Sequence, residues 1–111
     1  MWSVTEDPTT GAIVFKPPIH VTVELAHEAI HGLLAAMKEK TEPRELIVDL
    51  IDVQSLDPVV PLLGVQLMRK FAHKVSHVRL IVKDLQMRIA AATACQIVGA
   101  RYTVHMRWPE L

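Results

Sequence analysis

The sequence has almost no cysteine and no net charge. Cys95 is the one cysteine among 111 residues, so no disulfide can form within the chain, which fits a reducing compartment. Twelve Lys and Arg balance twelve Asp and Glu, and the formal net charge is zero. This balance removes the electrostatic argument for a nucleic-acid partner or a membrane surface. The same lack of repulsion between copies favours self-association.

Long apolar runs are also missing. No run approaches the roughly 20 residues that a membrane-spanning helix needs. Residues 1–8 lack a basic region followed by an apolar one, so we expect no secretory signal. Half of the residues are apolar and 22% are charged, a composition typical of a globular domain with one core. We therefore expect a single cytosolic domain over residues 1–111.

What the chain does have is a strongly strand-like central run, Glu45–Val53. Side chains of both parities are apolar: Leu46, Val48 and Leu50 on one face, and Ile47 and Ile51 on the other. A strand that is apolar on both faces is typical of the middle of a parallel sheet covered on both sides. This interpretation predicts that Val48 and Leu50 are buried.

Strand-like and helix-like segments alternate on both sides of this run. Two short strands, at 2–5 and 12–16, suggest an opening hairpin, and Pro17-Pro18 ends the second. Apolar spacing, N-caps and helix stop signals predict an extended stretch at 19–21, helices at 23–40, 58–74 and 85–98, and strands at 77–83 and 102–108. Pro61 is expected to make the start of the second helix irregular. The alternation predicts a single α/β domain with a mostly parallel sheet flanked by three helices.

The segment that starts at Leu46 carries a family resemblance. It reads Leu46-Ile-Val-Asp-Leu-Ile-Asp-Val-Gln-Ser-Leu-Asp-Pro-Val-Val-Pro61, and it resembles the strand-loop-helix of STAS domains, the family of anti-anti-sigma factors and sulfate-transporter tails. The family pattern is close to V-V-L-D-L-S-x-V-x-x-I-D-S-S-G-L. The residues in register with it are Asp49, Leu50, Val53, Leu56 and Asp57. The order of elements on both sides agrees with that fold.

The chain departs from the family at its regulatory serine. Where the family has a phosphorylatable Ser-Ser-Gly, this chain has Pro58, Val59 and Val60, so no hydroxyl there can accept phosphate. The resemblance implies a non-enzymatic protein-interaction or regulatory domain of the bacterial cytosol, without a phospho-switch and without a cofactor. The partner-binding residues that it implies are Gln54, Ser55, Asp57, Pro58, Val59, Val60 and Pro61.

One motif points to a different chemistry. His27-Glu-Ala-Ile-His31 is a formal H-E-x-x-H on the first predicted helix, where both imidazoles could bind one Zn²⁺ with Glu28 as base. The apolar stripe of this helix runs elsewhere, so the two histidines are expected on its solvated flank. No third ligand has supporting context, although Asp57, His73 and His77 are candidates. A zinc-dependent hydrolase therefore stays an alternative.

Two further hypotheses concern a cavity and an assembly. A small-ligand carrier would need an apolar cavity under the helices, which a sequence cannot reveal. A homodimer is favoured by the zero net charge and by two candidate sheet edges, the opening hairpin and the last strand. Trp2 and Trp108 could contribute to its interface, which Met106 and Leu111 could extend. Cys95, among alanines on the third helix, is expected to be a buried small residue and not a nucleophile.

Overall fold

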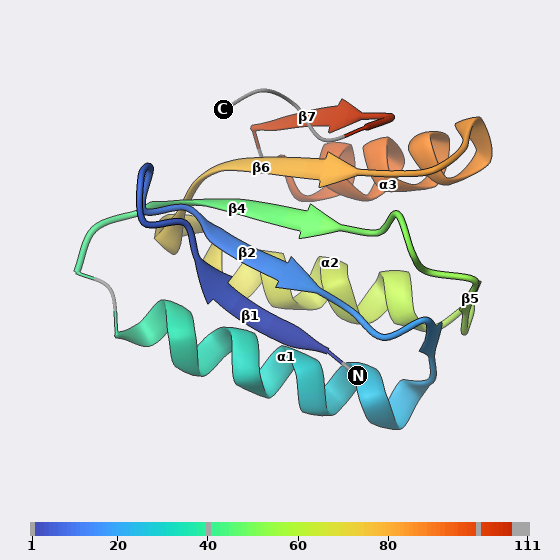
Figure 1. Ribbon diagram of the computed structural model, residues 1–111, viewed down its shortest axis with the longest axis horizontal. Coiled ribbons are helices and arrows are strands. Elements are labelled where there is room, and N and C mark those ends of the chain that lie inside the picture. Colours follow the sequence, from blue (N-terminus) through green and yellow to red (C-terminus); the bar gives the residue numbers. More distant parts are fainter. Residues whose placement is uncertain (1, 40, 100, 108–111) are drawn as a thin grey trace.

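The computed structural model describes residues 2–39, 41–99 and 101–107 (Figure 1). Strands and helices alternate along most of the chain, as the sequence predicts. The elements are β1 (Ser3–Glu6), β2 (Ile13–Lys16), β3 (His20–Val21), α1 (Val23–Lys38), β4 (Arg44–Asp49), β5 (Ser55–Leu56), α2 (Val60–Phe71), a 3-10 turn (Ala72–Lys74), β6 (Val75–Ile81), α3 (Leu85–Val98) and β7 (Tyr102–His105).

The main sheet has the strand order β1-β2-β4-β6-β7, so β4 is its middle strand, as predicted. β1 and β2 form the expected antiparallel hairpin, whereas β2, β4, β6 and β7 run parallel to one another. In one row of the sheet, Ile13 pairs with Leu46, Leu46 with Val78, and Val78 with Tyr102. β1 and β7 are the two edges, as expected. A separate pair of short strands, β3 and β5, forms a parallel two-stranded ladder.

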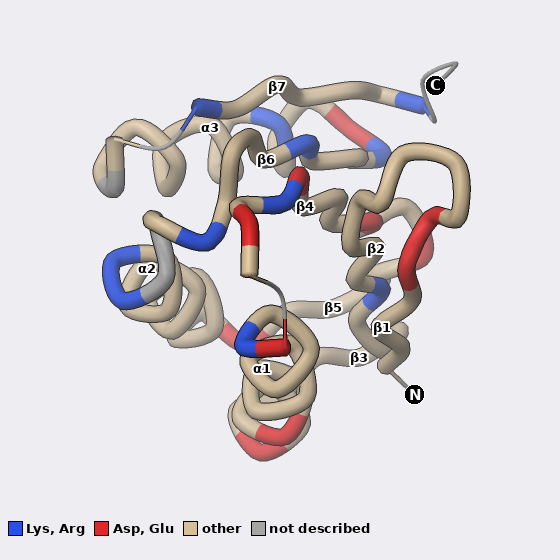
Figure 2. Tube along the Cα trace, turned by 90° about the vertical axis from the view of Figure 1, so that its left-hand side faces the viewer, with Lys and Arg blue, Asp and Glu red and all other residues tan. Residues whose placement is uncertain are grey.

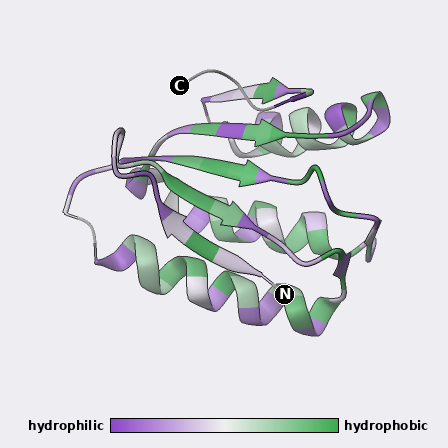
Figure 3. Ribbon diagram, in the orientation of Figure 1, coloured by the Kyte–Doolittle hydropathy of each residue, from purple (hydrophilic) through white to green (hydrophobic). Residues whose placement is uncertain are grey.

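All three helices lie on one face of the main sheet, as the end-on view of Figure 2 shows. Buried Leu33 and Met37 of α1 pack with Ile13 and Leu46 of the sheet, and side chains of α2 join this cluster. On the same face, Cys95 of α3 packs with strand residues of β6. Figure 3 shows the corresponding hydrophobic colour along β2 and β4.

The predicted cover on both sides of the sheet is wrong, because no helix of the described residues lies on the second face. Ile47 nevertheless has no exposed surface there, and it clusters with buried Ala12 and Ile81 and with Val14 and Ile51. All five residues come from the strands of the sheet or from turns next to them. Apolar side chains on the second face of the central strand therefore reflect packing between neighbouring strands and do not require a second layer of helices.

The burial pattern of β4 also corrects a prediction. Leu46 and Ile47 are buried, whereas Val48 and Leu50 are only half-buried. The strand ends at Asp49, four residues before the predicted end at Val53. It stops there because the Asp49 carboxylate accepts a hydrogen bond from the Ile51 N–H (3.1 Å), which turns the chain away from the sheet.

Helix ends agree with the capping signals where a cap is present. Thr22 Oγ1 accepts from the Leu25 N–H (3.2 Å) at the start of α1, and Asp84 Oδ1 accepts from the Met87 N–H (2.8 Å) at the start of α3. Gly99 ends α3 with a positive φ of 70°, a conformation that glycine adopts without strain. The predicted end of α1 at Lys40 lies outside the described residues; the helix itself ends at Lys38.

The start of α2 and the ends of the last two strands differ from the prediction. α2 begins at Val60, so Pro61 lies in the first turn, where a missing N–H costs nothing. β6 runs from Val75 to Ile81, two residues earlier than predicted at each end. β7 ends at His105 and the chain bends at Met106 and Arg107, while Trp108 lies outside the described residues. No helix among the described residues is long and apolar enough to span a membrane.

Candidate functional site at the carboxyl ends of the strands

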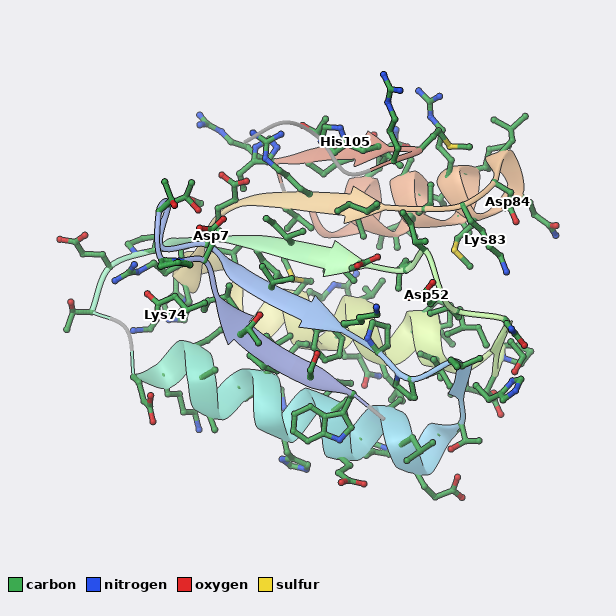
Figure 4. All side chains as sticks on the ribbon, viewed as in Figure 1. Asp7, Asp52, Lys74, Lys83, Asp84 and His105 are labelled. Atoms are coloured by element: carbon green, nitrogen blue, oxygen red, sulfur yellow. The ribbon has the colours of Figure 1, made fainter. Side chains whose placement is uncertain are left out.

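Three parallel strands end beside one another, and the loops that follow them build one end of the molecule. β2 leads into Pro17 and Pro18, β4 into residues 50–54 and β6 into residues 82–84. In open α/β sheets, ligands bind outside the carboxyl ends of the strands. Figure 4 shows labelled Asp52 and Lys83 at this end.

Main-chain hydrogen bonds fix the loop after β4 against the loop after β2. The N–H groups of Gln54 and Ser55 donate to the Ile19 carbonyl, at 2.8 and 3.3 Å, and the Asp57 N–H donates to the Val21 carbonyl at 2.9 Å. The His20 ring nitrogen Nδ1 lies 2.8 Å from Ser55 Oγ. These bonds form the β3–β5 ladder, and they hold the segment that leads into α2 in one position.

A shallow depression of about 520 Å³ lies beside this ladder, and polar and apolar residues line it. Lys16 Nζ and Asp52 Oδ2 form an ion pair at 2.7 Å, and Lys83 Nζ donates to the Val53 carbonyl at 2.7 Å. The hydrogen bond and negative charge of Asp52, with a smaller contribution from Asp49, raise the pKa of Lys16. The ion pair is half exposed, so water screens it and its contribution to stability is small.

Each ammonium of the depression already has an acceptor, and no Ser, Cys or His lines it. The arrangement therefore offers charge-paired and hydrogen-bonding groups, and it offers no activated nucleophile. The depression is open to solvent and contains charged residues, so it lacks the enclosed apolar wall that a carrier of small apolar ligands requires.

The predicted partner-binding residues lie together, but they divide into two groups. Asp57 and Val60 have structural roles: Asp57 Oδ1 accepts from the Val59 N–H (3.0 Å), and Val60 packs against buried Val21 and Val53. The others have exposed side chains on the loop and the helix start: Gln54, Ser55, Pro58, Val59 and Pro61.

Three exposed apolar residues of this end are not among the named partner-binding residues, although Leu56 and Leu62 lie within the predicted loop and helix start, residues 54–63. Ile19, Leu56 and Leu62 have 48%, 39% and 62% of their surface exposed, and Val59 has 47%. We call the group Ile19, Leu56, Pro58, Val59, Pro61 and Leu62 the carboxyl-end surface. The usable signal in the sequence was a run of apolar residues around two prolines, in a place where a solvated loop would carry polar ones.

The H-E-x-x-H residues lie elsewhere, with His27, Glu28 and His31 exposed on α1. His77, a candidate third ligand, precedes Val78 of β6, which packs against α3, so His77 belongs to the opposite face of the sheet; its Nε2 is 2.7 Å from Thr103 Oγ1. Among the residues that the structure describes, no group of three His, Cys, Asp or Glu side chains is placed to hold a metal ion.

A second polar group lies on that same sheet face. Arg79 of β6 forms an ion pair with Glu45 of β4, and its Nη1 is 3.3 Å from Nε2 of His105 on β7. These side chains link three adjacent strands, and about 30% of the side-chain surface of Arg79 and of Glu45 is exposed. The group has the character of a cross-strand polar network that stabilises the sheet.

The fold is shared with a solved structure. An uncharacterised protein of the DUF3478 family from Shewanella loihica PV-4, described as having a SpoIIAA-like fold, superposes with a TM-score of 0.72 at 15% sequence identity. The match covers 94% of this chain and 83% of that protein. The chain has the SpoIIAA-like fold. This is the fold of STAS domains, so the resemblance seen at Leu46–Pro61 is confirmed at the level of fold. No protein-family model and no curated protein matches the sequence.

Proposed function

We propose that this STAS-like domain is a non-enzymatic interaction module of the bacterial cytosol that docks a protein partner on the carboxyl-end surface. The observation that carries the proposal is the group of apolar side chains around Pro58 and Pro61, at the end of the sheet where such folds bind. Val59 and Leu62 are about half exposed or more, although apolar side chains of their size are usually buried.

The rigidity of this surface supports docking. The β3–β5 ladder fixes its first part, and the Asp57 cap fixes the start of α2. Two prolines restrict the backbone between them. A surface ordered before binding loses little conformational entropy on association, which favours affinity.

The proposal includes no phosphorylation switch. Pro58, Val59 and Val60 carry no hydroxyl, and the nearby Ser55 hydroxyl is hydrogen-bonded to His20. Binding is therefore expected to depend on apolar contact and on the amount of each partner present, with no change on kinase treatment.

The test compares two matched charge substitutions. Val59→Glu places a carboxylate on the carboxyl-end surface, and Met106→Glu places one on an equally exposed residue after β7 (47% and 44% exposed). A glutamate just before α2 is favourable to the helix dipole, so the first variant should fold. Each protein is immobilised and exposed to native cytosol. A partner that wild type and Met106→Glu retain and that Val59→Glu loses supports the proposal; equal retention by all three refutes it.

A further inference from the structure

The outward face of α3 is apolar, exposed and free of charge. Leu85, Ile89 and Ile97 have 63%, 60% and 57% of their surface exposed. The helix packs on the sheet through its opposite side, where Cys95 and Ala91 join β6. Exposure of three large aliphatic side chains on one helix face is typical of a surface that another molecule covers.

Polar residues on this face add little hydration. Gln86, Thr93 and Gln96 are its other large side chains. The Thr93 hydroxyl donates to the Ile89 carbonyl (2.9 Å), and Gln96 Nε2 donates to the Tyr102 hydroxyl (3.0 Å). Two of the three polar side chains therefore already have partners within the chain.

The order of residues along this face is self-complementary. Two antiparallel copies of a helix related by a two-fold axis place residues i and j at the same level when i plus j is constant. With the axis at position 91, Leu85 lies level with Ile97 of the second copy, and Ile89 lies level with Thr93. The same axis places Gln86 level with Gln96 of the second copy, whose Nε2 is hydrogen-bonded to Tyr102 and whose carboxamide oxygen can accept from the Gln86 amide.

The ends of the helix agree with the same arrangement. Asp84 caps the N-terminus and Arg101 follows the C-terminus, and both are exposed. Antiparallel pairing brings each Asp84 toward the end of the other helix, where Arg101 carries the opposite charge. The two helix dipoles are then also antiparallel, which is favourable.

We propose that α3 is the interface of a two-fold homodimer, with its axis at position 91. The interface differs from the one expected from the edge strands and the tryptophans. A helix of this length is about 20 Å long. Its face is small beside the roughly 800 Å² per partner of a standard interface, so the dissociation constant is expected in the micromolar range.

A lipid surface is the weaker candidate for this face. Amphipathic helices that lie on membranes carry Lys and Arg beside their apolar face. Within Leu85–Val98, Arg88 is the one basic residue. A second copy needs no such cations, because it presents the same uncharged surface.

The first experiment is sedimentation velocity from micromolar to submillimolar concentration. Wild type should shift from one to two chains, whereas Ile89→Glu should stay monomeric, with a dissociation constant raised about a hundredfold or more because two carboxylates enter one interface. The matched control is Ala35→Glu, at an exposed helical position of α1 outside both proposed surfaces, which should dimerise as wild type does. Glutamate suits a helix interior better than isoleucine, so the Ile89 variant should fold.

A charge pair tests the register itself. Thr93→Lys alone should weaken dimerisation, but an equal mixture of the I89E and T93K chains should form a heterodimer, because the two substituted positions lie level. A wild-type chain that stays monomeric at every concentration would overturn the proposal. So would dimers that I89E leaves intact, or a mixture that stays monomeric although T93K and I89E are folded. Binding of the monomer to anionic vesicles, abolished by I89E, would assign the face to lipid and also overturn it.

Discussion

The Trp2 indole lies directly over Gly32 of α1. A β-carbon on Gly32 would come within 2.2 Å of the ring atom Cη2 and 2.5 Å of Cζ3, so the ring occupies the space that any larger residue would need. Trp2 therefore packs within its own chain, and it is half-buried there. This contact packs the start of β1 against the first helix. Trp2 is therefore no longer a candidate residue for a dimer interface. Trp108, the other tryptophan of that case, lies outside the described residues.

This contact predicts that the effect of Gly32→Ala on stability differs in sign between the Trp2→Ala variant and the protein with Trp2 in place. In Trp2→Ala, Gly32→Ala should stabilise the protein by about 1 kcal/mol, because alanine is the better helix former. With Trp2 in place, the same substitution should be neutral or destabilising, because the new methyl group displaces the ring. Urea unfolding of the four proteins measures the coupling. Equal effects of Gly32→Ala in both backgrounds would contradict the contact.

The central strand predicts a graded loss of stability. Leu46 is 3% exposed and packs between the sheet and α1, so Leu46→Ala should destabilise by about 2–5 kcal/mol. Leu50 follows the strand and is half-buried, so Leu50→Ala should cost clearly less. Denaturant midpoints of the two variants give the comparison. A larger loss at Leu50 would show that the strand is placed wrongly.

Much of the fold could be predicted because its signals are local. Thr22 and Asp84 cap helices where they stand in the sequence, and Gly99 ends one. The cover of the second sheet face could not be predicted in the same way. The apolar pattern at Ile47 predicts that its side chain is buried, but it does not predict which residues cover it. In the structure, neighbours on adjacent strands such as Ile81 cover it.

The candidate site could be predicted in part. Its location followed from the strand-loop-helix pattern, and the exposed Pro58, Val59 and Pro61 were found. Ile19 was missed because it belongs to a different segment, which only the β3–β5 ladder brings alongside. The face of α3 was missed because its apolar spacing is the same as that of a buried face.

The burial of Cys95 predicts that its thiol reacts slowly with alkylating reagents. It is 8% exposed, and its burial raises the pKa of the thiol, so the native protein holds less thiolate at any pH than the unfolded chain. Alkylation by iodoacetamide at mildly alkaline pH should be at least about tenfold slower in native protein than in urea, and its pH profile should move upward. Mass spectrometry gives the rates. Equal rates in both states would mean that the thiol is accessible.

The exposed positions of the H-E-x-x-H histidines predict that replacing both has little effect on stability or binding. His27 and His31 are exposed on α1, so replacing both with alanine should change the free energy of unfolding by no more than about 0.5 kcal/mol per site. The variant should also bind its partner as wild type does. Elemental analysis of both proteins is the control. Stoichiometric zinc in wild type that the double variant loses would restore the hydrolase hypothesis.

The most direct test of the docking surface is photo-cross-linking in living cells. A benzoylphenylalanine placed at Val59 should join the chain to one other protein, seen as a single adduct of higher mass. The same probe at His27, exposed on α1, should give no such adduct. One specific adduct at Val59 is the result that the account predicts. No adduct at Val59, or the same adduct from both positions, would contradict a partner on the carboxyl-end surface.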